Sequence, residues 1–142
     1  MTIDNYFMRM SKKENILEEK SFQFAVRTVK LCKHLREEKN EWTLSKQLLR
    51  SGTSIGANIV EAQQAQSRPD FVSKLCISLK ESAETSYWLR LLMATDYLSE
   101  KEYTSIARDC KELEKLLTSI IKSTKTSGQM TSAVHNEPEK PE

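Results

Sequence analysis

The sequence predicts an all-α protein whose single domain is an antiparallel up-down-up-down four-helix bundle. Three glycines and three prolines are few for 142 residues, and two of the prolines lie in the last five positions. Apolar residues recur with alternating spacings of three and four, which is the period of one helix face. The intervals between the periodic segments are short, so neighbouring helices are expected to run antiparallel. A hydrophobic content of 38% suffices for one core.

The first helix, predicted over residues 12–38, carries two apolar stripes on different sides. One intramolecular face cannot bury both stripes, so we predict that the second one packs against another subunit. The alternative is an unusually wide core face near the start of the helix. The main stripe consists of Leu17, Phe24, Thr28, Leu31 and Leu35, and the candidate oligomer interface consists of Phe22, Val26 and Val29.

The same helix carries a line of basic residues at the edge of its main stripe. Four of them recur every seven residues, a spacing that keeps them on one flank, and two more lysines lie nearby. Repeated around an oligomer, the line could hold phosphates of a nucleic acid. Interspersed glutamates dilute the charge, and an ordinary solvated flank is the alternative. The candidate nucleic-acid contacts are Lys13, Lys20, Arg27, Lys30, Lys33 and His34.

The second helix, predicted over residues 42–66, contains the unusual segment QLLRSGTSIGANIVEA, with Gly52 and Gly56 four positions apart. Each glycine in a helix interior costs about 1 kcal/mol relative to alanine. Close approach of a neighbouring helix would offset that cost, and we predict close packing at both positions. A phosphate-binding loop is the competing interpretation, but the segment matches no P-loop and follows no strand.

The third and fourth helices are predicted over residues 68–95 and 100–125. Ser67 with Asp70 and Ser99 with Glu102 have capping-box spacing at their starts. Polar side chains near a bundle core must be paired or reach water, so a network that fixes helix register is predicted. A catalytic carboxylate pair or a di-metal site is the alternative. The network candidates are Ser51, Asn58, Glu61, Lys80, Glu84 and Arg90.

The two ends of the chain lie outside this periodic pattern. Residues 1–11 are expected to be an N-terminal extension, and residues 12–125 the bundle domain. Residues 126–142 lack an apolar period and contain one lysine against three glutamates, so we predict a disordered acidic tail with a net charge of −2. The body of the chain is then about +4, compatible with weak attraction to a polyanion.

Several functional classes are disfavoured by composition. Helical di-metal sites need Glu-x-x-His pairs, and neither of the two histidines fits that motif. No serine or cysteine lies in a nucleophile motif, so no catalytic, cofactor-binding or metal-binding residues are predicted. The three cysteines lack CxxC spacing and are expected to be reduced core residues of a cytoplasmic protein. Neither a membrane span nor a small-molecule substrate is expected.

Three segments together resemble a known family. QLLRSGTSIGANIVEA, DFVSKLCISLKESAETSYWLRLL (70–92) and TSIIKSTK (118–125) resemble the 23S rRNA intervening-sequence proteins, also called four-helix bundle proteins. Ser82 departs from the family pattern, where alanine is expected. The resemblance implies an up-down bundle that forms a homo-oligomer, a pentameric ring, encoded in some bacteria within spacers of ribosomal RNA genes.

The leading hypothesis is a non-catalytic homo-oligomeric scaffold that binds RNA, or an RNA-associated protein, through a basic composite surface. The first alternative is a purely protein-binding or structural module. A second rests on fold analogy alone: the bundle is similar to the accessory subunit of the reverse transcriptase in diversity-generating retroelements. A hydrolase or metalloenzyme is the remaining class.

Overall fold

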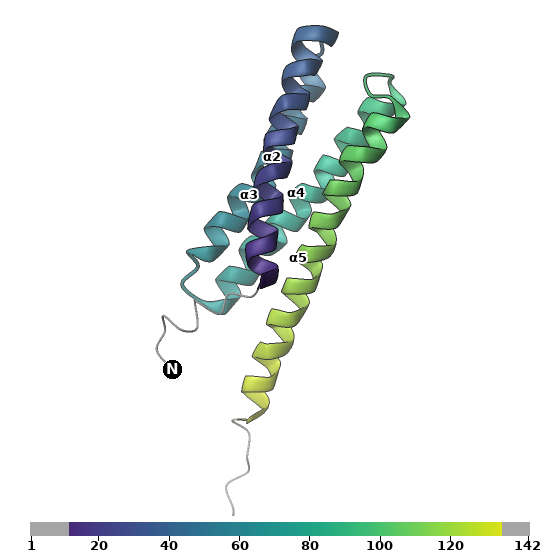
Figure 1. Ribbon diagram of the computed structural model, residues 1–142. Helices are drawn as coiled ribbons and strands as arrows, with labels where there is room; N and C mark the ends of the chain where they lie inside the picture. The colour runs from purple at the N-terminus through teal and green to yellow at the C-terminus, as the bar shows by residue number, and fades with distance from the viewer. Residues whose placement is uncertain (1–11, 135–142) are drawn as a thin grey trace, which may run out of the picture.

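The computed structural model of the chain describes residues 12–134, with side chains as far as residue 128. Within this range it consists of four helices: α2 (Lys12–Lys39), α3 (Thr43–Gln63), α4 (Arg68–Ala94) and α5 (Glu100–Val134). Each helix packs against the next along the chain, and α5 closes the bundle by contacting α2. Figure 1 shows the alternating directions of the helices, with the α2–α3 and α4–α5 turns at one end and the α3–α4 turn at the other. The predicted all-α, up-down bundle is confirmed.

Three helix starts have identifiable caps. Ser67 Oγ accepts a hydrogen bond from the Asp70 amide at 3.2 Å before α4. Ser99 and Glu102 exchange the two hydrogen bonds of a capping box before α5, at 3.1 and 3.2 Å. The start of α3 is different, because the Glu41 carboxylate accepts the backbone N–H groups of the first three residues of α3, at 3.1, 2.8 and 2.7 Å. Glu41 thereby satisfies donors that have no partner inside the helix.

The core combines large apolar side chains from all four helices with a set of buried hydroxyls. Two hydroxyls bond across the α3–α4 seam: Ser78 Oγ donates to the Ile55 carbonyl at 2.8 Å, and Thr85 Oγ1 donates to Ser51 Oγ at 3.0 Å. These side chains are short, so the helices that carry them can approach closely. The buried hydroxyl-bearing residues are Ser21, Thr28, Ser45, Ser51, Ser78, Ser82 and Thr85.

The fourth helix ends later than predicted. Helix α5 continues through residues 126–134 to Val134, so the predicted start of the tail at residue 126 is too early. No proline lies between Pro69 and Pro138, and the hydroxyls of Thr126 and Ser127 donate to carbonyls four residues back, at 2.9 and 3.0 Å. Hydrogen bonds of this kind form within a helix, so the serine- and threonine-rich composition did not end α5 at residue 126. Residues 135–142 of the predicted tail and the predicted extension 1–11 lie outside the described residues.

Candidate functional site

Half of the basic line of α2 is bonded to α5. Lys20 Nζ lies 2.6 Å from Glu112 Oε1, and Arg27 Nη1 lies 2.6 Å from Asp109 Oδ2. Lys13 Nζ donates to Ser119 Oγ at 3.0 Å. Three of the six predicted phosphate contacts are therefore engaged in bonds that join α2 to α5, and two of them have their charge matched by a carboxylate.

The other three predicted contacts, Lys30, Lys33 and His34, are exposed on α2. The two lysines form no ion pair within the described part of the chain. Lys30 borders the same α2–α5 groove as the paired residues, whereas Lys33 and His34 are not among the residues that line it. The seam with α5 therefore takes up only part of the predicted line.

A longer basic stripe lies on the outside of α5, and the sequence reasoning missed it. Eight residues recur with spacings of three and four over residues 101–125, and all are exposed. Six are lysine or arginine and two are threonine, with no acidic residue among them. At 1.5 Å per residue the stripe is about 36 Å long. This α5 ridge consists of Lys101, Thr104, Arg108, Lys111, Lys115, Thr118, Lys122 and Lys125.

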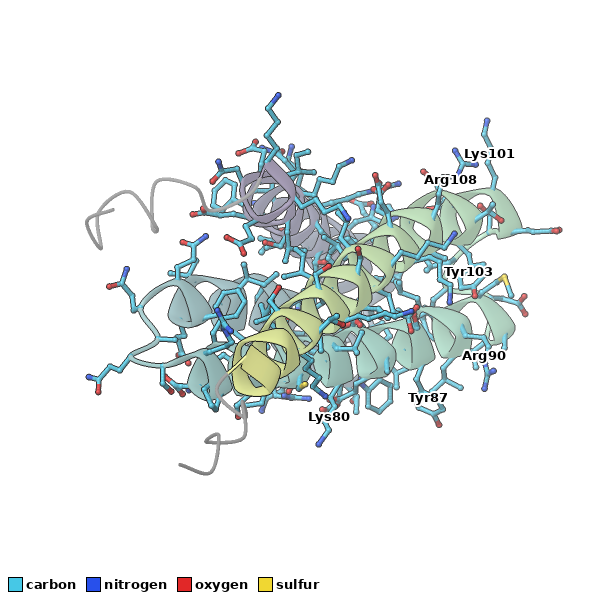
Figure 2. All side chains as sticks on the ribbon, turned by 90° about the horizontal axis from the view of Figure 1, so that it is seen from below. Lys80, Tyr87, Arg90, Lys101, Tyr103 and Arg108 are labelled. Carbon is cyan, nitrogen blue, oxygen red and sulfur yellow. The ribbon has the colours of Figure 1, made fainter. Side chains whose placement is uncertain are left out.

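The acidic residues of α5 lie beside the ridge and most are already engaged. Asp109 and Glu112 pair with α2, and Glu102 belongs to the capping box. Glu114 pairs with Lys111 at 3.1 Å. The other five cations of the ridge form no ion pair or hydrogen bond among the described side chains. Their positive charge is therefore available to an external polyanion, and Figure 2 shows Lys101 and Arg108 extending away from the bundle.

The predicted polar network is not one network. Glu84 and Glu81 bind Arg50, which the sequence reasoning did not name, and Trp88 Nε1 donates to Glu84 at 3.2 Å. The pairing with Arg50 lowers the pKa of Glu84. Most of the predicted members are scattered: Glu61 pairs with Lys74 at 3.0 Å, Asn58 donates to the Ser54 carbonyl of its own helix, Ser51 bonds Thr85, and Lys80 and Arg90 extend into solvent (Figure 2).

The two helical glycines lie at the α2–α3 contact. A Cβ built on Gly52 would lie 2.7 Å from Thr28 Cγ2, whereas one built on Gly56 would meet nothing nearer than Ser21 Oγ at 3.4 Å. Gly56 also lines an open groove of about 420 Å³ between α2 and α3. Phe22 at the edge of this groove is 61% exposed, and Val60 across from it is 51% exposed. The second apolar stripe of α2 thus lies outside the core, with Val29 exposed and Val26 half-buried.

The described residues contain no candidate metal cluster, and their two fully buried thiols are not activated. No group of three or more His, Cys, Asp or Glu side chains among residues 12–128 could hold a metal ion. Burial raises the pKa of the Cys32 thiol to about 11, and burial also raises that of Cys110. Such thiols are protonated near neutral pH and are poor nucleophiles. Over the same residues, no helix combines the length and apolarity needed to cross a bilayer.

A model of the 23S rRNA-intervening sequence protein family matches residues 13–119. The chain belongs to this family. The match starts within α2 and ends within α5. The matched range therefore covers nearly all of the described bundle and most of the α5 ridge.

One solved member of a similarly described family is close in sequence. It is a protein with unknown function from the S23 ribosomal protein family, from Bacteroides thetaiotaomicron VPI-5482. The two chains are 58% identical, the similarity covers 78% of this chain and 98% of that one, and the TM-score is 0.77. The search of curated proteins found no match to this chain.

Proposed function

We propose that this protein is a non-catalytic, self-associating bundle that binds RNA through the α5 ridge. The observation that carries the proposal is the exposed row of cations along α5, five of which have no partner among the described side chains. Cations without protein partners are the groups that displace counterions from a phosphate backbone. The description of the family, which refers to the 23S rRNA intervening sequence, supports RNA as the polyanion.

The ridge suits backbone contacts rather than base recognition. Lysine is a flexible point charge, and five of the six ridge cations are lysines. The two threonines of the ridge add only hydroxyl groups. Each hydroxyl already donates to a backbone carbonyl four residues back in α5, at 2.8 Å. Affinity should therefore depend strongly on salt and weakly on RNA sequence.

Self-association is supported by a different surface. Phe22 on α2 and Val60 on α3 are exposed apolar side chains that line the α2–α3 groove, and Val29 is a further exposed apolar residue of α2. Exposed apolar side chains gathered around a groove mark interaction sites more often than scattered single ones do. The groove and the α5 ridge lie on different helices, so one copy can use both at once. Each added copy would bring another ridge, and several ridges raise the effective concentration of cations along one RNA.

The RNA hypothesis is tested by charge reversal at matched positions. Arg108→Glu with Lys115→Glu reverses two ridge cations, and Lys12→Glu with Lys80→Glu reverses two exposed lysines elsewhere. Both pairs change the net charge equally, so a difference between them isolates the ridge from the overall charge. Binding of a labelled RNA is measured by fluorescence anisotropy over a series of salt concentrations.

Five phosphate contacts to a single strand give a slope of about −3.5 in log K against log salt, or roughly a 100-fold loss between 50 and 200 mM salt. The ridge pair should reduce the magnitude of that slope by about 1.4 and weaken binding at low salt. The control pair should change the slope little. Equal loss in the two pairs, or no binding by the wild-type protein at low salt, contradicts the proposal and favours a purely protein-binding module.

The self-association hypothesis is tested by mass. Light scattering should give several times the 16.4 kDa of one chain. Phe22→Glu should lower that mass because it places a charge in the apolar surface, whereas Ile77→Glu on α4, at a position 40% exposed, should leave it unchanged. A wild-type monomer, or an equal effect of the two variants, would refute the assignment of this surface.

A further inference from the structure

We propose that the RNA bound by this protein is single-stranded, and that one of its bases stacks on Trp42 at the end of the bundle where the α5 ridge begins. This inference rests on the proposed function and adds to it the conformation of the RNA and a second contact. Trp42 was not among the residues that the sequence pattern singled out.

Trp42 is presented as a rigid, open aromatic surface. Its side chain is 61% exposed in the turn between α2 and α3, although tryptophan is usually largely buried. The Arg36 guanidinium carbon lies 5.5 Å from the ring centroid, within the range of a cation–π contact. Arg36 is itself held, because its Nε donates to Ser45 Oγ at 3.1 Å. The indole is therefore oriented by α2 and α3 rather than free in a loop.

The backbone on either side of the ring is also fixed. The adjacent residue Glu41 is only 7% exposed, and its carboxylate accepts the three backbone N–H groups that follow Trp42. Glu41 N donates back to the Leu35 carbonyl at 2.9 Å. A turn tied at so many points loses little conformational entropy when a ligand contacts it, which favours binding.

The position of Trp42 connects it to the ridge. The antiparallel topology places the end of α2, the start of α3 and the start of α5 together at one end of the bundle (Figure 1). The electrostatics of α5 agree: hydrogen bonds from Ser99 lower the pKa of Glu102, and the nearby charges of His34 and Lys39 lower it further. Two exposed basic residues of α2, His34 and Lys39, therefore lie near the first turn of α5, the helix whose ridge begins at Lys101. A strand that follows the ridge meets positive charge again at the end that carries Trp42.

An aromatic face selects unpaired bases. A base in a duplex is already stacked on its neighbours, whereas every unpaired base has a free face to offer an indole. The other strongly exposed aromatic residues lack this setting. Phe22 borders a groove that also contains Glu18 and Glu19, and Tyr87 packs edge-on against Trp88 with centroids 5.1 Å apart. Trp42 alone among these three combines an exposed ring, a guanidinium partner and a position at the end of the bundle where the α5 ridge begins.

The test uses full-length protein carrying Trp88→Phe, so that Trp42 is the sole tryptophan. Its fluorescence is followed while an unstructured single-stranded RNA of about 20 nucleotides, or a duplex of the same length, is added. We expect the single strand to quench Trp42 and the duplex not to. Trp42→Ala should weaken single-strand binding by about 5- to 150-fold, the contribution of one stacked base, with the salt slope unchanged.

Tyr87→Ala serves as the matched removal of an exposed aromatic residue and should change binding less than about 2-fold, since Tyr87 lies on α4 and not in the α2–α3 turn. Denaturant unfolding of Trp42→Ala checks that the bundle remains intact. Equal affinity for the two RNAs, together with unchanged binding by Trp42→Ala, overturns the stacking inference while leaving the ridge in place. Failure of the parent protein to bind either RNA at low salt overturns both proposals.

Discussion

Gly52 and Gly56 lie one helical turn apart in α3, yet alanine should stabilise the protein at Gly56 and should not do so at Gly52. A methyl group on Gly52 would lie 2.7 Å from Thr28 Cγ2 and 2.9 Å from Thr28 Oγ1. On Gly56 the nearest atom would be Ser21 Oγ at 3.4 Å, an ordinary contact distance. Substitution at Gly52 therefore requires part of α2 or α3 to move, whereas substitution at Gly56 does not.

The magnitudes follow from two opposing terms. Replacing a helical glycine by alanine stabilises a helix by about 1 kcal/mol, because alanine loses less backbone entropy on folding. Overpacking a well-filled core costs about 1–3 kcal/mol. Thr28 cannot easily move aside, because it is fully buried and its hydroxyl donates to the Phe24 carbonyl at 2.8 Å. We expect Gly56→Ala to stabilise by about 0.5–1 kcal/mol and Gly52→Ala to be less stable than it by about 1–3 kcal/mol.

The assay is urea unfolding followed by circular dichroism, at one protomer concentration because self-association contributes to apparent stability. The helix-propensity gain is common to both variants, so the difference between their free energies of unfolding reports the contact with Thr28. Thr28→Ala should relieve part of the cost of Gly52→Ala, with a coupling energy of about 1–2 kcal/mol. Equal stability of the two glycine variants, or no coupling to Thr28, would refute the reasoning.

Three further outcomes are expected. Glu41→Ala should lower the free energy of unfolding by about 1–3 kcal/mol, because three backbone donors lose an ionised acceptor, whereas Glu37→Ala on exposed surface should change it little. Cys32, with a pKa of about 11, is roughly 0.1% thiolate at pH 8, so mass spectrometry should show half-buried Cys76 alkylated first in the folded protein; faster labelling of Cys32 would contradict its burial. Arg27→Ala should cost only about 0–1 kcal/mol, because both partners of its ion pair are partly exposed; a loss above about 2 kcal/mol would show that the pair is central to the fold.

The fold was predictable because its determinants are local. The core stripe of α5 and the serine caps at Ser67 and Ser99 depend only on residues close in sequence, and they located the starts of α4 and α5. The start of α3 is less regular, because Glu41 acts through its carboxylate from the position before the N-cap and is not among the usual capping residues. The end of α5 was predicted too early because the apolar period stops near residue 125, whereas the helix continues to Val134.

The candidate site was less predictable because its charges depend on tertiary partners. The basic residues of α2 and those of α5 recur with the same seven-residue spacing, as at Lys20 and Arg27, or Arg108 and Lys115. Sequence period can place such residues on one flank, but it does not say whether a carboxylate faces them. The ridge could have been found by extending the search for basic periodicity to the fourth helix. The absence of partners for the ridge cations could not have been found from the sequence, because it depends on which helix packs against α5.

The distribution of charge on α5 then separates folding from binding. Asp109 and Glu112 on one flank meet Arg27 and Lys20 of α2, so an RNA bound to those cations would have to displace bonds that hold the bundle closed. Binding to the five unpaired cations of the ridge would break no such bond between helices. A cation such as Lys115 binds nothing else among the described residues, so contact with phosphate requires no rearrangement of the helices. Of the two basic lines, the one on α5 therefore suits the proposed RNA contact better, because phosphate could approach it without breaking bonds between helices.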